Sequence, residues 1–218
     1  MAEMHDTTEE YLETILELEE EGVVPLRARL VERLGLSAPA VSETVNRLSA
    51  AGYTELRTDR SIRLTPKGRN LATTVVRRHR LAERLLADVI GLEWEKVHRE
   101  AALWEHAISA DVEVKLVELL GDPMTCPHGN PIPGSKRTAQ PVPSTMLTEA
   151  APGKVTVTRI SEKLELDDAS LELVARARLI PGASATVLSR NPDGVRVKTG
   201  AGEHTVPTGV AEQMYVTV

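Results

Sequence analysis

The side chains best suited to chemistry in this 218-residue chain are imidazoles and carboxylates that recur at helical spacing. His79 and Glu83 are four residues apart, so they share one face of a helix. His98 is followed about two turns later by Glu105 and His106. Imidazole together with carboxylate suits first-row divalent metals. The spacing therefore indicates a metal site, and surface histidines without a ligand role are the alternative at this point.

The elements that must position these residues are helices. Thr65-Pro66 is typical of a helix start, because proline fits the first helical position, and this helix is expected to run to about residue 89. Residues 93–120 give two further amphipathic segments. Their apolar side chains exceed what one small domain can bury, which predicts a dimer interface.

A second pattern precedes these helices. Residues 25–34 predict a short helix, Gly35-Leu36-Ser37 a turn, and residues 38–51 a second helix capped by Ser37. Two helices joined by so short a turn form a helix-turn-helix. Two β-like runs, 53–57 and 62–65, then predict a hairpin in the position of a wing. An additional helix is expected from Thr7 or Thr8 to about residue 20.

The charge is distributed unevenly along the chain. The net charge is −6, yet residues 22–80 carry twelve Lys or Arg against four acids. Residues 1–21 carry nine acids and no Lys or Arg. A basic block of this kind favours contact with phosphates, so double-stranded DNA is the expected partner, with a solvated basic surface as the alternative.

Composition excludes several other classes of protein. Aromatic residues make up 2 % of the chain, which argues against recognition of single-stranded nucleic acid by stacking. The N-terminus has no apolar signal segment, and no apolar run reaches the roughly 18 residues of a membrane span. A single cysteine fits a reducing compartment. We therefore expect a cytoplasmic protein that contacts no membrane.

The C-terminal part has a different character. Residues 121–153 are rich in Pro, Gly, Ser and Thr and predict a linker, and alternating runs from residue 154 predict the short strands of a small barrel. The predicted fold is mainly α with a small β domain: a winged helix-turn-helix domain (1–65), a helical metal-binding and dimerisation domain (66–120), the linker, and an SH3-like β-barrel (154–218). Within the linker, Cys126 and His128 are ligand types without a second pair, so a structural role is expected for them.

Five motifs in order, PLRARLVERLGLSAPAVSETVNRL, DRSIRLTPKGRNLA, RRHRLAERLL, WEHAIS and HGNPIPG, give the chain a resemblance to the DtxR family. These proteins are metal-dependent repressors of bacterial iron and manganese homeostasis. The resemblance covers residues 5–135 closely, and over residues 150–218 it concerns layout. It implies a homodimeric repressor, not an enzyme and without a small-molecule substrate, that binds a palindromic operator when loaded with a divalent metal.

The second helix of a helix-turn-helix enters the major groove with its first residues against base edges. Here the residues at that position are Ser37, Ala38, Pro39, Ala40, Ser42 and Glu43. Phosphate contacts are expected from Arg27, Arg29, Arg47 and Arg60. Glu43 departs from the glutamine expected by resemblance, and its carboxylate can accept a hydrogen bond from cytosine N4.

The resemblance implies two metal sites. One consists of His79, Glu83 and His98 with a carboxylate from the barrel, for which Asp167 is the best match. The other consists of Glu10, Ala102, Glu105 and His106, with Glu13 as a further carboxylate one turn after Glu10. Glu10 stands where methionine is expected and Ala102 where cysteine is expected. The second site is therefore either a sparser oxygen-rich site or a vestigial one.

Replacing sulfur ligands by oxygen favours Mn²⁺ over softer ions. We therefore expect a manganese-dependent repressor, with Co²⁺, Ni²⁺ or Zn²⁺ able to replace the metal in vitro. One alternative is an Fe²⁺-dependent repressor that uses Glu10 as its oxygen ligand. Another is a winged-helix regulator gated by an organic ligand. A metalloenzyme is disfavoured because the sequence has neither a nucleophile motif nor an HExxH motif.

Overall fold

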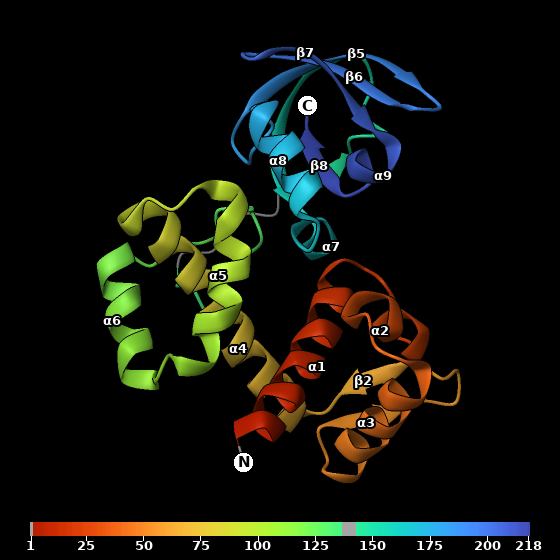
Figure 1. Ribbon diagram of the computed structural model, residues 1–218, viewed down its shortest axis with the longest axis vertical. Coiled ribbons are helices and arrows are strands. Elements are labelled where there is room, and N and C mark those ends of the chain that lie inside the picture. The colour runs from red at the N-terminus through yellow and green to blue at the C-terminus, as the bar shows by residue number, and fades with distance from the viewer. Residues whose placement is uncertain (1, 137–142) are drawn as a thin grey trace. The chain divides into compact units, whose positions relative to one another are not determined.

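The computed structural model describes residues 2–136 and 143–218, so the middle of the expected linker lies outside the described residues. The chain divides into two compact units, Met1–Arg78 and His79–Val218, and each is described by itself. Figure 1 shows helices and a short hairpin in the first unit, and helices followed by a sheet in the second. No helix in the described ranges combines the length and the apolar character that a membrane crossing requires.

The first unit is a winged helix-turn-helix. Its elements are α1 (Ala2–Glu20), α2 (Arg27–Leu34), α3 (Ala38–Ala50), β1 (Thr54–Leu56), β2 (Ile62–Leu64) and the beginning of α4 (Pro66–Arg84). The strands β1 and β2 pair antiparallel, with Glu55 opposite Arg63. The predicted helix-turn-helix and hairpin are thus confirmed, while α1 begins several residues earlier than the threonines at which its start was expected.

Local sequence explains the sharp turn between α2 and α3. Gly35 ends α2 in the left-handed region with φ 66°, which glycine adopts without steric cost. Ser37 then caps α3 by accepting a hydrogen bond from the backbone N–H of Ala40. Leu30 and Val41 are fully buried in the core of this unit. That burial fixes which face of α3 points outward.

The helical part of the second unit follows from the end of α4. Its elements are the π-helical turn η1 (Leu85–Ile90), η2 (Trp94–Lys96), α5 (Val97–Trp104), η3 (Glu105–Ala107) and α6 (Ala110–Leu120). Their buried apolar residues form one cluster that includes Leu81, Val97 and Leu116. The exposed apolar residues of this part are Val89, Ile90, Leu103, Trp104, Val112, Val114 and Leu119.

A six-stranded antiparallel sheet completes the second unit, in the order β3-β8-β4-β5-β6-β7. Its elements are β3 (Thr145–Met146), β4 (Gly153–Ile160), α7 (Glu162–Glu165), α8 (Asp168–Arg176), β5 (Ser184–Asn191), β6 (Gly194–Thr199), β7 (Gly202–Pro207), α9 (Thr208–Ala211) and β8 (Met214–Thr217). The predicted mainly α fold with an SH3-like β domain is confirmed. The helices α7 and α8, between β4 and β5, were not anticipated.

The helical part and the sheet part of the second unit contact each other through buried polar groups. Arg80 of α4 is 1 % exposed, and its Nη2 donates to Glu162 of α7 over 2.8 Å. Asn130, after α6, donates to the Ile160 carbonyl at 3.1 Å and to Glu165 at 2.8 Å. The short helix α7 is therefore held against α4 and the segment after α6.

Candidate metal centre and DNA-reading surface

A group of imidazoles and carboxylates, buried except for the half-buried His98, lies within the second unit. Its members are His79 and Glu83 from α4, His98 from α5, Cys126 and His128 from the segment after α6, and Glu162 and Glu165 from α7. We call these seven residues the buried donor cluster. Three of its subsets have ligand atoms within 4.8 Å of one another: His79, Glu83 and His98; Glu83, Cys126 and His128; and His98, Glu162 and Glu165.

The first subset is the site predicted from helical spacing. His79 Nε2 is 3.3 Å from Glu83 Oε1 and 3.1 Å from His98 Nδ1. His98 Nδ1 is 3.4 Å from the same Glu83 oxygen. The i, i+4 pair on α4 and one residue of α5 thus converge as expected from sequence. Three nitrogen and oxygen donors at this spacing can hold a first-row divalent ion.

Two further side chains reach the same point from distant parts of the chain. Glu165 Oε2 is 3.1 Å from His98 Nδ1. His128 Nδ1 is 3.0 Å from Glu83 Oε1 and 2.8 Å from Glu165 Oε2. Sequence reasoning missed Glu165 and assigned His128 a structural role. The available signal for α7 was the i, i+3 spacing of Glu162 and Glu165, which places both on one side of a short helix.

The barrel carboxylate expected to complete the first site was Asp167, and the structure places that side chain elsewhere. Asp167 caps α8: its Oδ1 accepts from Ala169 N at 3.2 Å and its Oδ2 accepts from the Ser170 hydroxyl at 2.6 Å. The carboxylate that approaches His98 from the barrel is instead Glu165, two residues earlier. An N-cap aspartate has its oxygens committed to the helix start, so Asp167 is not oriented as a ligand here.

The electrostatics of the buried donor cluster favour added positive charge. Burial alone would lower the pKa of His98, but the Glu165 and Glu83 carboxylates outweigh burial and raise that pKa to about 9. The pKa of His79 is raised well above its usual value, because Glu105 and Glu83 outweigh the opposing effect of burial. The His128 pKa is raised in the same way, against burial, by Glu165 and Glu83. The cluster therefore stabilises cations at its centre.

The residues present fit a divalent ion. Glu83 Oε2, Glu162 Oε2 and His128 Nε2 are buried and have no hydrogen-bond partner among the described residues. Imidazoles must be neutral to bind a metal, and in that state the Glu83, Glu162 and Glu165 carboxylates exceed the Arg80 guanidinium by two negative charges, which a divalent ion would balance. Buried charge of this size is costly unless a counter-ion neutralises it. Cys126 is also buried, and burial, with Glu83 as the second cause, raises the pKa of its thiol to about 12.

The residues expected in the second metal site lie in both units. Glu105 is buried, pairs with the Nδ1 of His79, and has its Oε1 3.3 Å from His106 Nε2. The His106 side chain is 26 % exposed, and Ala102 is exposed on α5. Glu10 and Glu13 lie on α1 of the first unit. Within the second unit, Glu105 thus connects the two groups of candidate ligands through His79.

The predicted base-reading residues lie in the first half of α3, and Arg47 lies in its last turn. Ser37, Ala38, Pro39, Ala40, Glu43 and Arg47 are exposed, and Ser42 is half-buried. Sequence reasoning missed Asn46, which is exposed one turn after Glu43. Arg27 Nη2 donates to Asn46 Oδ1 at 2.9 Å, so Arg27 is tied to the same face of α3. Small side chains at the start of this helix allow close approach to base edges.

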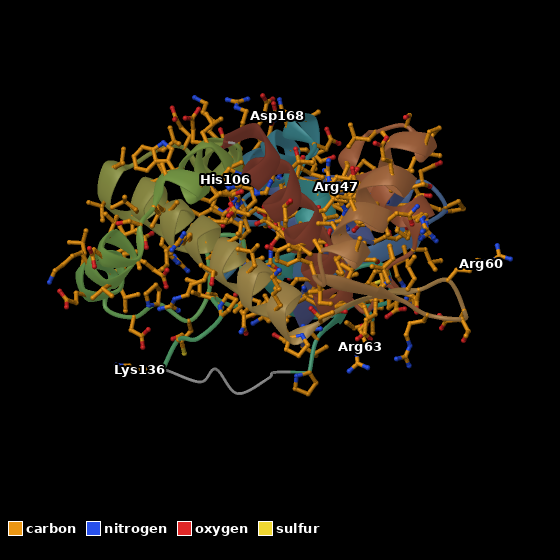
Figure 2. The ribbon with its side chains drawn as sticks, turned by 90° about the horizontal axis from the view of Figure 1, so that it is seen from below. Arg47, Arg60, Arg63, His106, Lys136 and Asp168 are labelled. Carbon is orange, nitrogen blue, oxygen red and sulfur yellow. The ribbon has the colours of Figure 1, made fainter. Side chains whose placement is uncertain are left out.

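The hairpin and α2 place further arginines at the surface. Arg60 has φ 68° in the turn between β1 and β2, and Figure 2 shows its side chain at the tip of the hairpin, pointing away from the unit. Arg63 on β2 is exposed and was not singled out from sequence. Arg29 forms an exposed ion pair with Glu32 at 2.7 Å. An exposed pair of this kind contributes little stability, so Arg29 can exchange its partner for a phosphate.

Two family models match the chain. Residues 3–62 match the iron-dependent repressor N-terminal DNA-binding domain, and residues 65–134 match the iron-dependent repressor metal-binding and dimerisation domain. Among curated relatives, the chain is 45 % identical over 227 residues to the iron-dependent repressor IdeR of Mycobacterium tuberculosis, covering 99 % of each chain. It is 46 % identical over 199 residues to the diphtheria toxin repressor of Corynebacterium diphtheriae, covering 88 % of each.

Solved structures show the same similarity over the whole fold. A structure described as IdeR of T. acidophilum has a TM-score of 0.77 at 33 % identity, covering 96 % of this chain and 97 % of that one. A manganese-dependent transcriptional repressor in complex with manganese has a TM-score of 0.82 at 30 % identity, covering 96 % and 99 %. These relatives are transcriptional repressors, which are DNA-binding regulators and not enzymes.

Proposed function

Because the chain belongs to the iron-dependent repressor (DtxR) family of metal-dependent transcriptional repressors, we propose that it binds a palindromic DNA operator as a homodimer when loaded with Mn²⁺. The observation that carries the proposal is the combination of a buried imidazole–carboxylate cluster with an exposed reading helix in one chain. Such a repressor acts in the cytoplasm, on genes of metal homeostasis.

The proposed contacts with DNA follow from the exposed face of α3. Ser37, Pro39 and Glu43 meet base edges, and Arg27, Arg47 and Arg60 meet phosphates. The homodimer is supported by the family's dimerisation domain and by the exposed apolar residues between positions 89 and 119. Two reading helices then occupy half-sites roughly 34–36 Å apart, one turn of DNA.

The proposed switch acts through the second metal site. Glu10, Glu105, His106 and the Ala102 backbone, with Glu13 as a further carboxylate, would hold an ion whose ligands come from α1 and from the helical part of the second unit. The ion supplies positive charge that offsets the clustered carboxylates. If the ion binds the DNA-competent arrangement more tightly, it shifts the population toward that arrangement. DNA must then tighten metal binding by the same factor.

Mn²⁺ is proposed because oxygen stands where sulfur ligands are expected: Glu10 is a carboxylate and Ala102 contributes no thiol. Fe²⁺ is the second candidate, favoured by the names of the relatives that are 45 % and 46 % identical. Both ions accept imidazole and carboxylate ligands.

The test is DNA affinity measured with each metal. An inverted-repeat fragment is first selected from a random pool by the Mn²⁺-loaded protein. Fluorescence anisotropy then gives the affinity with Mn²⁺, anaerobic Fe²⁺, Co²⁺, Ni²⁺, Zn²⁺ or a chelator. We expect chelator to abolish specific binding and Mn²⁺ to activate at the lowest free concentration. Equal affinity with and without chelator would contradict metal dependence and favour an organic effector.

A further inference from the structure

The outward face of the reading helix α3 carries a continuous stripe of exposed residues. Pro39, Glu43 and Asn46 are exposed and follow one another at intervals of four and three positions, so they lie along one line of the helix. Pro39 to Asn46 spans about two turns, the length over which the reading helix of a homeodomain contacts bases. Asn46 is therefore placed to reach a base edge beyond the one that Glu43 faces.

Arg27 fixes the direction of the Asn46 amide. Arg27 Nη2 is 2.9 Å from Asn46 Oδ1. A guanidinium has only N–H donors and no acceptor, so the amide atom that faces it must be the oxygen. Arg27 is half-buried and its Nε is enclosed by neighbouring atoms, so this guanidinium is held by the packing of its unit. The Asn46 NH₂ group consequently lies on the other arm of the amide, away from Arg27.

An amide held in this way reads bases differently from a free one. A free asparagine accepts from adenine N6 and donates to adenine N7 at the same time, which requires both its oxygen and its nitrogen. In Asn46 the oxygen is occupied by Arg27, so the donor group is what remains for a base. Guanine presents two acceptors, N7 and O6, side by side in the major groove. A donor-only amide thus matches guanine and loses its advantage with adenine.

Glu43 supplies the complementary chemistry on the same stripe. Its ionised carboxylate only accepts hydrogen bonds, which suits the N4 donor of cytosine. Asn46 lies three positions further, about 4.5 Å along the helix axis, and successive base pairs are about 3.4 Å apart. The two side chains therefore face neighbouring base pairs, Glu43 as the acceptor and Asn46 as the donor.

We propose that Asn46 is a specificity-determining residue that donates to a guanine beside the base pair read by Glu43, and that Arg27 is the positioning residue that makes Asn46 donor-only. This inference rests on the proposed function in that α3 must enter a major groove. The remaining guanidinium donors of Arg27 hold a phosphate while its Nη2 holds Asn46 Oδ1. A bound phosphate thus helps to fix the amide that reads the base.

The test compares sequence preference in the full-length protein. Wild type and variants, each loaded with Mn²⁺, select inverted-repeat DNA from one random pool, and the selected half-sites are sequenced. Asn46→Ala should lose preference at a single position of each half-site, which identifies the base that Asn46 reads. In the wild type that base should be guanine, and adenine there should weaken binding about 5- to 150-fold, measured by fluorescence anisotropy.

Two further variants test the direction of the amide. Arg27→Met removes the donor to Oδ1 and keeps an unbranched side chain, so the whole amide becomes available and adenine should replace guanine at that position. Asn46→Asp keeps an acceptor for Arg27 but offers the base only a second acceptor, so cytosine should replace guanine. The matched control Asn70→Ala removes an exposed asparagine of α4 and should keep the wild-type preference at every position.

A merely structural role for the bond between Arg27 and Asn46 would lower affinity in these variants without changing the base that is selected. That result, or a wild-type preference for adenine at the position lost in Asn46→Ala, would overturn the inference while leaving a metal-dependent repressor in place. A wild-type protein that selects no sequence with any divalent metal would overturn the proposed function as well. Asn46 is exposed and alanine favours a helix, so Asn46→Ala is expected to fold.

Discussion

The two groups of candidate metal ligands differ in how the chain supplies them. The donors around Glu83 all lie in the second unit and are spaced for one ion, and they are buried except for His98, whose side chain is 13 % exposed. The donors of the other site are divided, with Glu10 and Glu13 on α1 and Glu105 and His106 in the second unit. A site confined to one unit can be preorganised by that unit's core, whereas a divided site makes ion binding a constraint between units.

This difference suggests a division of labour. An ion in the preorganised site stabilises one unit and needs no movement of the DNA-binding unit. Under the proposed function, an ion bound by residues of both units would couple metal concentration to the placement of the reading helix and so act as the switch. Glu105, one of the ligands proposed for the divided site, pairs with His79, so a single carboxylate links the two groups of candidate ligands.

The largest effect is expected from His106→Ala. Loss of this ligand should reduce metal-dependent DNA affinity to the chelator level, a drop of about 5- to 150-fold for a typical coupling, while one metal remains bound per chain. Anisotropy with the selected operator and metal analysis after dialysis measure both quantities. His204→Ala is the control. If His106→Ala still binds operator at the wild-type metal concentration, the divided site is vestigial and the switch resides at the His79 site.

Glu83→Ala tests the preorganised site, where the expected change is in metal-induced thermal stability. Metal at 100 times its Kd stabilises a protein by about 2.7 kcal/mol, which in a domain of this size raises Tm by roughly 5–10 °C. Glu83→Ala should lose most of that increase, because Glu83 contacts three imidazoles of the cluster. Calorimetry with and without Mn²⁺ measures it, with the exposed Glu118→Ala as control. An undiminished metal-induced shift in Glu83→Ala would show that the cluster holds no ion.

Ala102→Cys should strengthen metal binding at the divided site. A thiolate at this exposed position on α5 adds a soft ligand where the chain now has none, so activation is expected at several-fold lower Co²⁺ or Zn²⁺ concentration, with less gain for Mn²⁺. Ala102→Ser, which adds a hydroxyl of similar size, is the matched control. Identical changes for every metal in both variants would indicate that position 102 is not part of a metal site.

The smallest effects concern the phosphate contacts. Arg60→Ala should lower the slope of log affinity against log salt by about 1, with no change in sequence preference. Arg27→Ala should lower the slope similarly but also alter preference, because Arg27 is bonded to Asn46 on the reading helix. Salt titrations on operator and scrambled DNA measure both, with Arg190→Ala in the barrel as control. Unchanged slopes in both variants would remove these arginines from the DNA interface.

Local patterns were sufficient to predict much of the molecule. Gly35 and Ser37 define the turn and cap between α2 and α3 through their own backbone and side-chain properties, so the helix-turn-helix could be located from sequence. The His79 and Glu83 pair follows from the 3.6-residue period of a helix alone. Alternation of side chains similarly predicted the strands of the barrel.

Other parts of the site depended on contacts between distant segments. His128 lies beside Glu83, although the two residues are 45 positions apart in the sequence. The position of His128 depends on contacts with Trp94 and β4 and on the positive φ of Gly129. Helical spacing in the sequence does not predict these contacts. Glu165 rather than Asp167 faces His98, because the four-residue helix α7 directs Glu162 toward α4 and Glu165 toward α5, while Asp167 caps the next helix. The sequence by itself determined which residue types could bind a metal; only tertiary packing decided which oxygens and nitrogens meet, since burial against other elements fixes side-chain direction.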